Sequence, residues 1–140
     1  GTIVKLIDNA AGIAAIRHTH LNCVTASIDR MDFITPVFVG NLLLIYASVN
    51  YTGNTSMEIG VKVIAECLPT GDQVHVASAY LTYVALDADD EPTAIPPIIL
   101  ETEEEQKRFE AAKQRRKKRL ERVKSSKHHH RNQECLLRPP

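Results

Sequence analysis

The chain has 140 residues and no net formal charge, and 44% of its residues are hydrophobic, which suits one folded domain with an appendage. Its three cysteines lack paired or metal-ligand spacing, which argues against a disulfide framework, and we expect a reducing, cytoplasmic compartment. No apolar run reaches the roughly 18 residues of a membrane-spanning helix, so we expect no membrane as a partner.

The neutral total hides an asymmetry between two parts of the chain. Residues 1–100 carry four Lys/Arg and ten Asp/Glu, whereas residues 101–140 carry thirteen and seven. The first part therefore has a net charge of −6 and the second a net charge of +6. This pattern predicts a packed acidic domain at 1–100 and a basic appendage after it.

Residues 2–18 predict an apolar helix, because apolar side chains recur at helical spacing and cover most of its sides. A helix of this kind is usually enclosed by other structure. Arg17 and His18 end the helix, where positive charge is favourable, so we assign them a structural role. The residues that form and widen the main apolar face are Ile3, Leu6, Ile7, Ala10, Ile13, Ala14 and Ile16.

Asp8 interrupts this apolar helix. It shares one polar side with Lys5, Asn9 and Gly12, at spacings of three and four residues. An ionised carboxylate is costly to bury unless it has a partner or a task. Gly12 weakens the helix but permits close approach of another group. The polar side is therefore either solvent-facing or part of a functional site.

Four later segments predict β-strands, because apolar and polar residues alternate along them. The second is the richest in apolar residues, which favours a central place in a sheet. Turn-forming sequences at 52–55 and 69–72 predict antiparallel pairing of the strands that they join. The predicted strands are 22–33, 42–51, 57–63 and 74–86.

These elements together predict an α+β fold in which an antiparallel sheet wraps around the long apolar helix. A charged C-terminal helix is expected at 101–124. It starts near Thr102, because Thr102 and Glu105 match a capping box and acidic residues fill the first turn. Residues 125–140 lack periodicity and are expected to form a disordered tail.

Two clusters in the appendage suggest other functions. The basic run at 115–119 is of a kind that can bind nucleic acid, but it lacks interleaved aromatic residues, so we do not expect that partner. The alternative is a solvated helix that attracts an anion or docks on an acidic domain. Three adjacent histidines at 128–130 lack the spacing of a folded metal site, and we expect neither a metal nor another cofactor.

Several short stretches occur in an order that is typical of one family. They are Gly1-Thr-Ile-Val-Lys-Leu-Ile-Asp8-Asn-Ala-Ala-Gly-Ile-Ala-Ala15, Arg17-His18, Val24-Thr-Ala-Ser-Ile-Asp29, Asp32-Phe33, Pro36-Val37, Val39-Gly40, Thr55-Ser-Met-Glu-Ile59, Ala77-Ser-Ala-Tyr-Leu-Thr-Tyr-Val84 and Glu101-Thr-Glu-Glu-Glu-Gln-Lys-Arg-Phe109. Over roughly residues 1–120 the chain resembles the hotdog-fold acyl-CoA thioesterases. The resemblance is to their acyl-CoA hydrolase branch, which includes brain acyl-CoA hydrolase and single-domain bacterial relatives.

This resemblance implies a hotdog fold, hydrolysis of fatty acyl-CoA to fatty acid and coenzyme A, and a role in fatty acid metabolism. Asp8 occupies the position of the family's catalytic aspartate, as a general base on water or as a nucleophile that forms an anhydride. In the family, protomers pair edge to edge around the active site, so we expect a homodimer and a larger trimer of dimers. The unpaired sheet edge also favours association.

The chain departs from the family at the start of the helix. Members of the family have His-Gly-Gly there, with an assisting asparagine some residues earlier, and Gly1 matches only the last glycine. The resemblance therefore assigns the oxyanion site to Gly1, where helix amides stabilise developing negative charge. We expect the other residues to precede Gly1 in the natural chain. If they are truly absent, the first strand is absent too and the protein is inactive.

Four further residues are candidates for binding the substrate or its coenzyme A moiety. Asn9 could position water or substrate, although a simple polar contact is the alternative, and Gly12 allows close approach. Thr55 and Ser56 follow a tight turn, in a part of the chain that lies near coenzyme A in the resembling enzymes. Exposed backbone amides there could bind phosphate, and hairpin chemistry is the alternative role.

Two alternatives to an enzyme remain open. A hotdog domain could bind acyl-CoA or a nucleotide without turnover, or the protein could act on partners through its basic helix. Turnover that depends on Asp8 favours the hydrolase. Binding that survives in Asp8→Asn without turnover in either form favours the binding module, and loss of partner binding on deletion of 102–140 favours the interaction protein.

Overall fold

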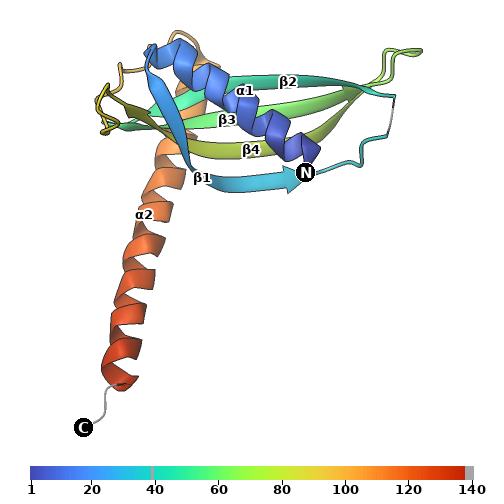
Figure 1. The fold of residues 1–140 in the computed structure, drawn as a ribbon. Coiled ribbons are helices and arrows are strands. Elements are labelled where there is room, and N and C mark those ends of the chain that lie inside the picture. The colour runs from blue at the N-terminus through green and yellow to red at the C-terminus, as the bar shows by residue number, and fades with distance from the viewer. Residues whose placement is uncertain (39, 138–140) are drawn as a thin grey trace.

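The computed structural model describes the backbone of residues 1–38 and 40–137, and the side chains of residues 1–38 and 40–123. Figure 1 shows a sheet with α1 lying across one face and α2 leaving from the other side. No helix in this described part of the chain is long and apolar enough to cross a membrane. In chain order the elements are α1 (Thr2–Thr19), β1 (Asn22–Phe33), β2 (Leu42–Thr52), β3 (Ser56–Glu66), β4 (Gln73–Leu86) and α2 (Glu103–Leu137).

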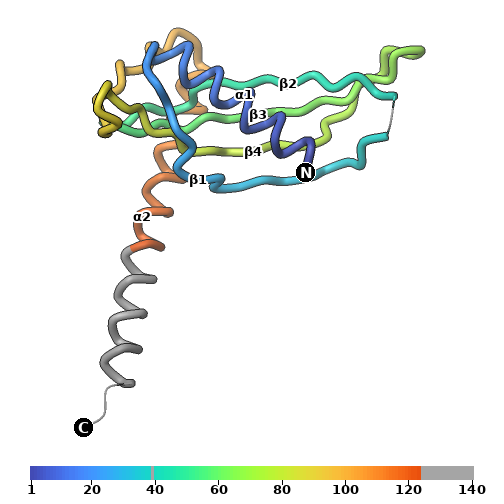
Figure 2. The backbone as a smooth tube through the Cα atoms, in the orientation of Figure 1, coloured from blue at the N-terminus to red at the C-terminus, as the bar shows by residue number. Residues whose placement is uncertain are grey.

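The four strands form one antiparallel sheet in the order β1-β4-β3-β2, which confirms the expected α+β hotdog arrangement. The hairpins β2–β3 and β3–β4 pair as their turn sequences predict. Strand β1 pairs with β4 instead of β2, and Figure 2 shows the intervening segment passing the ends of β4 and β3 on its way to β2.

The prediction that the second strand is central is wrong, because β2 forms an edge of the sheet. Its apolar residues are mostly half-buried and lie between two hollows. One hollow opens between β2 and α1, and the other opens between β2 and the start of α2. The apolar run of β2 therefore fits an edge strand, because α1 lies on one of its faces and the start of α2 on the other.

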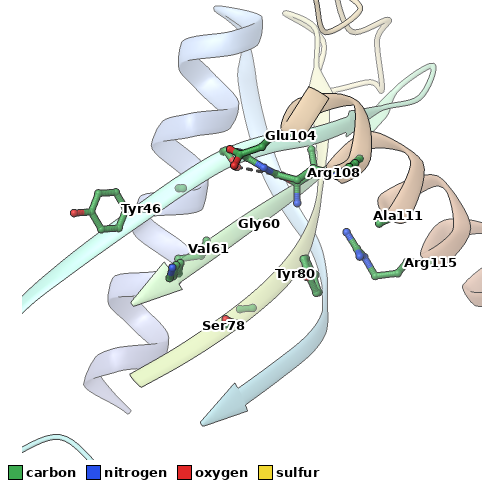
Figure 3. A pocket seen from close by; sticks show the side chains of 15 residues that line it. Tyr46, Gly60, Val61, Ser78, Tyr80, Glu104, Arg108, Ala111 and Arg115 are labelled. Carbon is green, nitrogen blue, oxygen red and sulfur yellow. Dashed lines mark hydrogen bonds and ion pairs between the residues drawn. The ribbon is translucent and has the colours of Figure 1, made fainter. Parts of the chain in front are cut away.

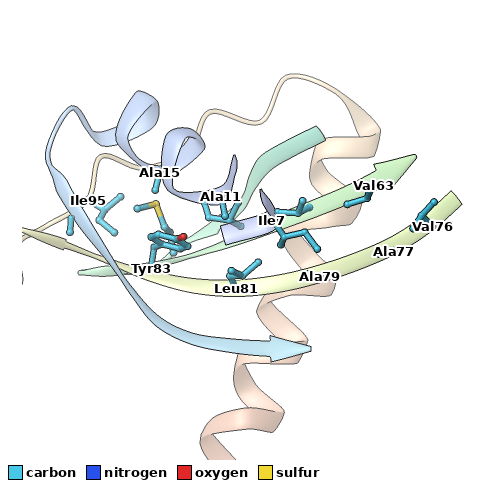
Figure 4. Close-up of a cluster of buried hydrophobic side chains, with 14 of the residues drawn as sticks. Ile7, Ala11, Ala15, Val63, Val76, Ala77, Ala79, Leu81, Tyr83 and Ile95 are labelled. Atoms are coloured by element: carbon cyan, nitrogen blue, oxygen red, sulfur yellow. The ribbon is translucent and has the colours of Figure 1, made fainter. Parts of the chain in front are cut away.

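The core lies between α1 and alternate residues of β3 and β4 (Figure 4). One side of α1 is buried through residues four positions apart, and its alanines allow the helix to lie close to the sheet. The strands contribute every second residue, as expected when one sheet face packs on a core. The buried set includes Ile7, Ala11, Ala15, Met57, Ile59, Val61, Val63, Ala77, Ala79, Leu81 and Tyr83.

The sequence predicts that other structure encloses α1 on most sides, and in the single chain this prediction is wrong. Leu6, Ile13 and Ile16 are exposed in the single chain, and Ile13 reaches 61%. The physical reason is that one sheet can cover only one side of a helix. An exposed apolar side of this kind is typical of a surface that another chain covers.

The start of α2 agrees with the predicted capping pattern. The Thr102 hydroxyl accepts the backbone N–H of Glu105 at 3.1 Å, and the Glu105 carboxylate accepts the N–H of Glu101 at 2.9 Å. The helix bounds extend to Leu137, beyond the end predicted at residue 124. The predicted disordered tail at 125–140 and the histidines at 128–130 lie outside the residues whose side chains are described.

Candidate active site

Asp8 faces the part of the sheet that β1 and β4 form. Its carboxylate oxygen Oδ1 accepts hydrogen bonds from the hydroxyls of Thr25 at 2.9 Å and Tyr83 at 2.7 Å. The Tyr83 hydroxyl also lies 2.8 Å from the backbone carbonyl oxygen of Asp8. Among the residues with described side chains, none donates a hydrogen bond to Oδ2 of Asp8. This second oxygen is therefore available to water or to a substrate.

The register of the sheet brings the two hydroxyls together. Thr25 and Tyr83 are partners across β1 and β4, so both project from the sheet toward α1. A register shift lies directly after Thr25, between Thr25 and Ser27. Irregularities of this kind re-aim side chains, and they are frequent beside active sites.

Tyr83 is a buried residue with a polar tip, since only 3% of its surface is exposed. Burial is the main cause that raises the pKa of Tyr83 to about 12, with a smaller contribution from the Asp8 carboxylate and an opposing one from the Thr25 hydrogen bond. The phenol consequently remains protonated at neutral pH. It can act there as a hydrogen-bond donor but not as a base.

Only part of the predicted α1 site converges on Asp8. Gly12 lies beside Tyr83, and a methyl group at this position would sit 3.6 Å from the Tyr83 hydroxyl oxygen, which is ordinary contact. Gly1 caps the start of the helix, seven residues before Asp8 and hence about 10 Å away along the axis. Asn9 is exposed. The structure therefore brings Gly12 near Tyr83 and Asp8, leaves the Asn9 side chain exposed, and places Gly1 away from Asp8 along the helix.

Thr55 and Ser56 lie at the hairpin between β2 and β3. Ser56 pairs with Val84 of β4 and lines a hollow on the face of the sheet opposite Tyr83, with Arg116 of α2. The Ser56 carbonyl accepts the Gly53 N–H at 2.8 Å, and the Thr55 carbonyl accepts the Ala85 N–H at 3.2 Å. These contacts fit the hairpin role, and the sheet separates the Ser56 side chain from Asp8 of the same chain.

His18 at the end of α1 has a structural partner. Its Nε2 atom donates a hydrogen bond to the backbone carbonyl of Pro96 at 2.7 Å, which ties the helix end to the segment after β4. Arg17 lies in the same last turn, where cations favour the helix dipole. Both observations agree with the structural role expected for these residues.

The basic run of α2 docks on acidic residues of its own domain. Arg115 donates two hydrogen bonds of 2.8 Å to Glu58, whose side chain is only 7% exposed. Arg119 contacts Asp29 at 2.9 Å and the Thr82 hydroxyl at 3.0 Å. The Glu58 hydrogen bonds are the main cause that raises the pKa of Arg115. Two cations of the run are thus used to hold α2 against the sheet.

A hollow of about 820 Å³ lies between the sheet and the first turns of α2 (Figure 3). Its lining includes Tyr46, Lys62, Tyr80, Lys107 and Arg108. None of the site residues predicted from the sequence lines it. The Asp8 site and this hollow belong to different faces of the sheet, so we assign the candidate active site to the α1 face.

Sequence reasoning missed Thr25 and Tyr83 as site residues, although both lie in the stretches that resemble the family. A signal for Tyr83 was present: it continues the alternation of Ala79 and Leu81 on the core face, and a buried tyrosine hydroxyl usually finds a partner. For Thr25 the alternation was misleading, because it grouped Thr25 with Asp29, which contacts α2 on the other face.

The chain matches the model of the Thioesterase superfamily over residues 1–68. It is 39% identical over 102 residues to an uncharacterized acyl-CoA thioester hydrolase, YkhA of Bacillus subtilis, in a match that covers 73% of this chain and 59% of the relative. The chain therefore spans less than two thirds of the length of this curated relative.

Two solved structures share the fold. An apo-hexameric acyl-CoA thioesterase is 36% identical with a TM-score of 0.84, over 88% of this chain and 79% of that one. An acyl-CoA hydrolase from Staphylococcus aureus, in complex with butyryl coenzyme A, coenzyme A and coenzyme A disulfide, is 34% identical with a TM-score of 0.84, over 94% and 80%.

The Staphylococcus aureus hydrolase has also been solved with single residues replaced by alanine. An aspartate and a threonine were replaced in two of these variants, and they lie 17 positions apart. Asp8 and Thr25 have the same separation of 17 positions in this chain.

Proposed function

The chain belongs to the thioesterase superfamily, and on this basis we propose that it hydrolyses fatty acyl-CoA to a free fatty acid and coenzyme A. The observation that carries the proposal is the Asp8 carboxylate, with one oxygen held by two hydroxyl donors and the other available. The relatives named as acyl-CoA hydrolases support the same substrate class.

The proposed reaction uses Asp8 as a general base. A water molecule on Oδ2 gives its proton to the carboxylate while its oxygen bonds to the thioester carbonyl carbon. The carbon–sulfur bond then breaks, and the leaving thiolate takes the proton from Asp8. The competing route joins Asp8 directly to the acyl group as an anhydride, which water then cleaves. Label in the Asp8 carboxylate after a single turnover in ¹⁸O water would identify the anhydride route with water attack at the aspartyl carbon, because the general-base route leaves the Asp8 oxygens unlabelled.

An apolar hollow near the start of α1 fits the acyl part of the substrate. It has a volume of about 380 Å³ and is lined by Ile3 of α1 and by residues 33–37, which follow on from β1. Ile3 precedes Asp8 by five residues, or about 7.5 Å along the helix. A thioester at Asp8 could therefore extend its hydrocarbon chain along α1 into this hollow.

We further propose that the active site is completed by a second copy of the chain. The free amides of the first turn of α1 suit an oxyanion, but Gly1 and Asp8 of one chain lie about 10 Å apart along the helix. One carbonyl group cannot reach both sites. If the helix start of one copy lies beside Asp8 of the other, one thioester carbonyl group can reach both. The apo thioesterase that resembles this chain is hexameric. A monomeric mass by light scattering at micromolar concentration would contradict this assembly.

We place this reaction in the cytoplasm. Both cysteines with described side chains, Cys23 and Cys67, are free, which fits a reducing compartment. Localisation of the tagged full-length protein by microscopy and fractionation is the corresponding test.

The test of the proposed function is thiol release by the full-length protein from acyl-CoAs of increasing chain length. Asp8→Asn keeps the shape of the side chain and removes its basic oxygen, and Asp89→Asn in an exposed turn is the matched control. We expect release by the wild type and the control, and release by Asp8→Asn that is slower by roughly 10²–10⁴-fold. Equal rates in all three would place the chemistry elsewhere, and binding without release by any form would favour a binding module.

A further inference from the structure

The Tyr83 hydroxyl contacts two oxygens that belong to the same residue. Its oxygen lies 2.7 Å from the carboxylate Oδ1 of Asp8 and 2.8 Å from the backbone carbonyl oxygen of Asp8. A phenol carries a single proton, which these two acceptors share, so the hydroxyl bridges the side chain of Asp8 and the helix backbone that carries it. This geometry fixes the side chain relative to its own helix.

We propose that Tyr83 is a positioning residue that holds the Asp8 carboxylate in one orientation, with Oδ2 directed to the reacting water. The inference rests on the proposed hydrolase function and deepens it. Tyr83 does not contact the substrate in this account. It acts through Asp8, and Thr25 adds a second hydroxyl to the same oxygen.

The surroundings of Tyr83 make it a rigid anchor. Its ring is buried in the core beneath α1, level with Met57 on the neighbouring strand, which is 1% exposed. Close-packed core side chains keep one rotamer, so the hydroxyl has a fixed place. A half-buried aspartate on a helix has several staggered rotamers, and a fixed donor selects among them. Catalytic groups must be held in this way, since small misplacements reduce rates strongly.

The ionisation of Tyr83 is consistent with a permanent donor. Its pKa of about 12 keeps the proton on the phenol at all pH values at which the enzyme would work. The other titratable groups near the pair are Lys5, one turn earlier on α1, and Cys23 on β1. Neither forms a hydrogen bond with Asp8 among the described residues.

The first test replaces Tyr83 with phenylalanine, which keeps the buried ring and removes the hydroxyl. Tyr80→Phe is the matched control, because it makes the same change on the same strand but on the opposite face of the sheet. We expect Tyr83→Phe to lower kcat by about tenfold, the effect of losing one hydrogen bond to a charged group, with KM changed less than about twofold. Unchanged kcat, or an effect confined to KM, would overturn the proposal.

A double-variant cycle separates positioning from a general structural role. If Tyr83 acts through the Asp8 carboxylate, Tyr83→Phe should have no further effect on the residual kcat of Asp8→Asn. A tenfold loss in both backgrounds would show that Tyr83 acts independently of Asp8, and it would overturn the proposal. Thermal unfolding of every variant identifies any loss that arises from misfolding.

A second replacement keeps the inference testable if Tyr83→Phe fails to fold. Genetic incorporation of 3,5-difluorotyrosine at position 83 retains the ring and hydroxyl but gives a more acidic phenol. Once this phenol ionises, it no longer donates a hydrogen bond to Asp8, so the alkaline limb of the kcat profile should move to lower pH. An alkaline limb identical to that of the wild type would contradict the role of Tyr83.

The same set of proteins separates this inference from the proposed function. If the wild type releases no thiol, or if Asp8→Asn equals the wild type, the hydrolase assignment fails. If Asp8→Asn loses activity while Tyr83→Phe equals both the wild type and Tyr80→Phe, only the positioning role fails. Activity that falls in Asp8→Asn and in Tyr83→Phe, but not in Tyr80→Phe, supports both.

Discussion

The two faces of strands β3 and β4 are built on opposite principles. On the α1 face, Met57, Ile59 and Leu81 form a dry apolar core, into which Tyr83 brings one hydroxyl. On the α2 face, the neighbouring positions are polar and still buried, as Glu58 and Thr82 show. The same two strands therefore support one helix by hydrophobic burial and the other by paired charge.

The α1 face therefore mainly stabilises the domain, and the α2 face mainly holds α2 against the sheet. Apolar contacts on the α1 face are non-directional and contribute to the folding of the domain as a whole. The contacts of α2 depend on particular partners, because a buried acid such as Glu58 is costly without its arginine. The α1 face should therefore respond to changes in volume, and the α2 face to changes in charge.

The largest expected effect is on the α1 face. Leu81 is completely buried, so Leu81→Ala should lower the free energy of unfolding by about 2–5 kcal/mol, through lost burial and a residual cavity. Denaturant unfolding followed by circular dichroism measures this change. A loss below about 1 kcal/mol would mean that this face is not the main source of stability.

The next effect depends on pH and reports the one buried hydroxyl of the α1 face. The pKa of Tyr83 is raised from 10.0 to about 12 in the folded state, so its contribution to stability is complete below pH 10. As pH rises from about 10 to 12, the unfolded state loses this proton first, and stability should fall by on the order of 2 kcal/mol.

Denaturant midpoints between pH 9 and 12 measure this decline, with Tyr83→Phe as the control. The wild type should lose more stability than the variant over this interval. Parallel curves for the two proteins would show that the Tyr83 phenol is not desolvated as the structure indicates.

A smaller effect is expected on the α2 face. Arg115→Ala leaves the Glu58 carboxylate without its main partner and should cost about 1–2 kcal/mol, a range reduced because Arg115 is 30% exposed. Adding Glu58→Gln removes the stranded charge and should recover part of this loss. If the double variant is no more stable than Arg115→Ala, charge pairing does not explain the docking of α2.

The smallest effect is expected two residues along the same basic run. Lys117 is exposed and forms no ion pair among the described residues, so Lys117→Ala should change stability by less than about 0.5 kcal/mol. Measured beside Arg115→Ala, it tests whether position or charge determines the contribution of a cation. Equal losses from the two substitutions would contradict the docking geometry.

Local sequence patterns predicted the elements well, because they are local properties. The first predicted strand has the same bounds as β1, and the two turn sequences lie where β2, β3 and β4 connect. The Thr102 cap could also be predicted, since its hydrogen bond with Glu105 spans only three residues. The pairing of β1 with β4 could not be predicted, because alternation within a strand does not specify its distant partner.

The candidate site was predicted only in part, for a related reason. Asp8 stood out as a carboxylate on an apolar helix, and the resemblance gave it a role. Its partner Tyr83 lies 75 residues along the chain. Its partner Thr25 lies on the next strand, but the register shift after Thr25 changes the face on which alternation would place it. Ser56 lies on the face opposite Asp8, a consequence of strand register that tight-turn chemistry cannot predict.

The most direct test of the central claim is the kcat for thiol release from a saturating long-chain acyl-CoA by the full-length protein and by its Asp8→Asn variant. If Asp8 is the base or nucleophile of a thioester hydrolase, kcat should fall by roughly 10²–10⁴-fold, while the folded fraction and coenzyme A binding remain unchanged. Equal kcat values in the two proteins would contradict the assignment of the reaction to the Asp8 carboxylate.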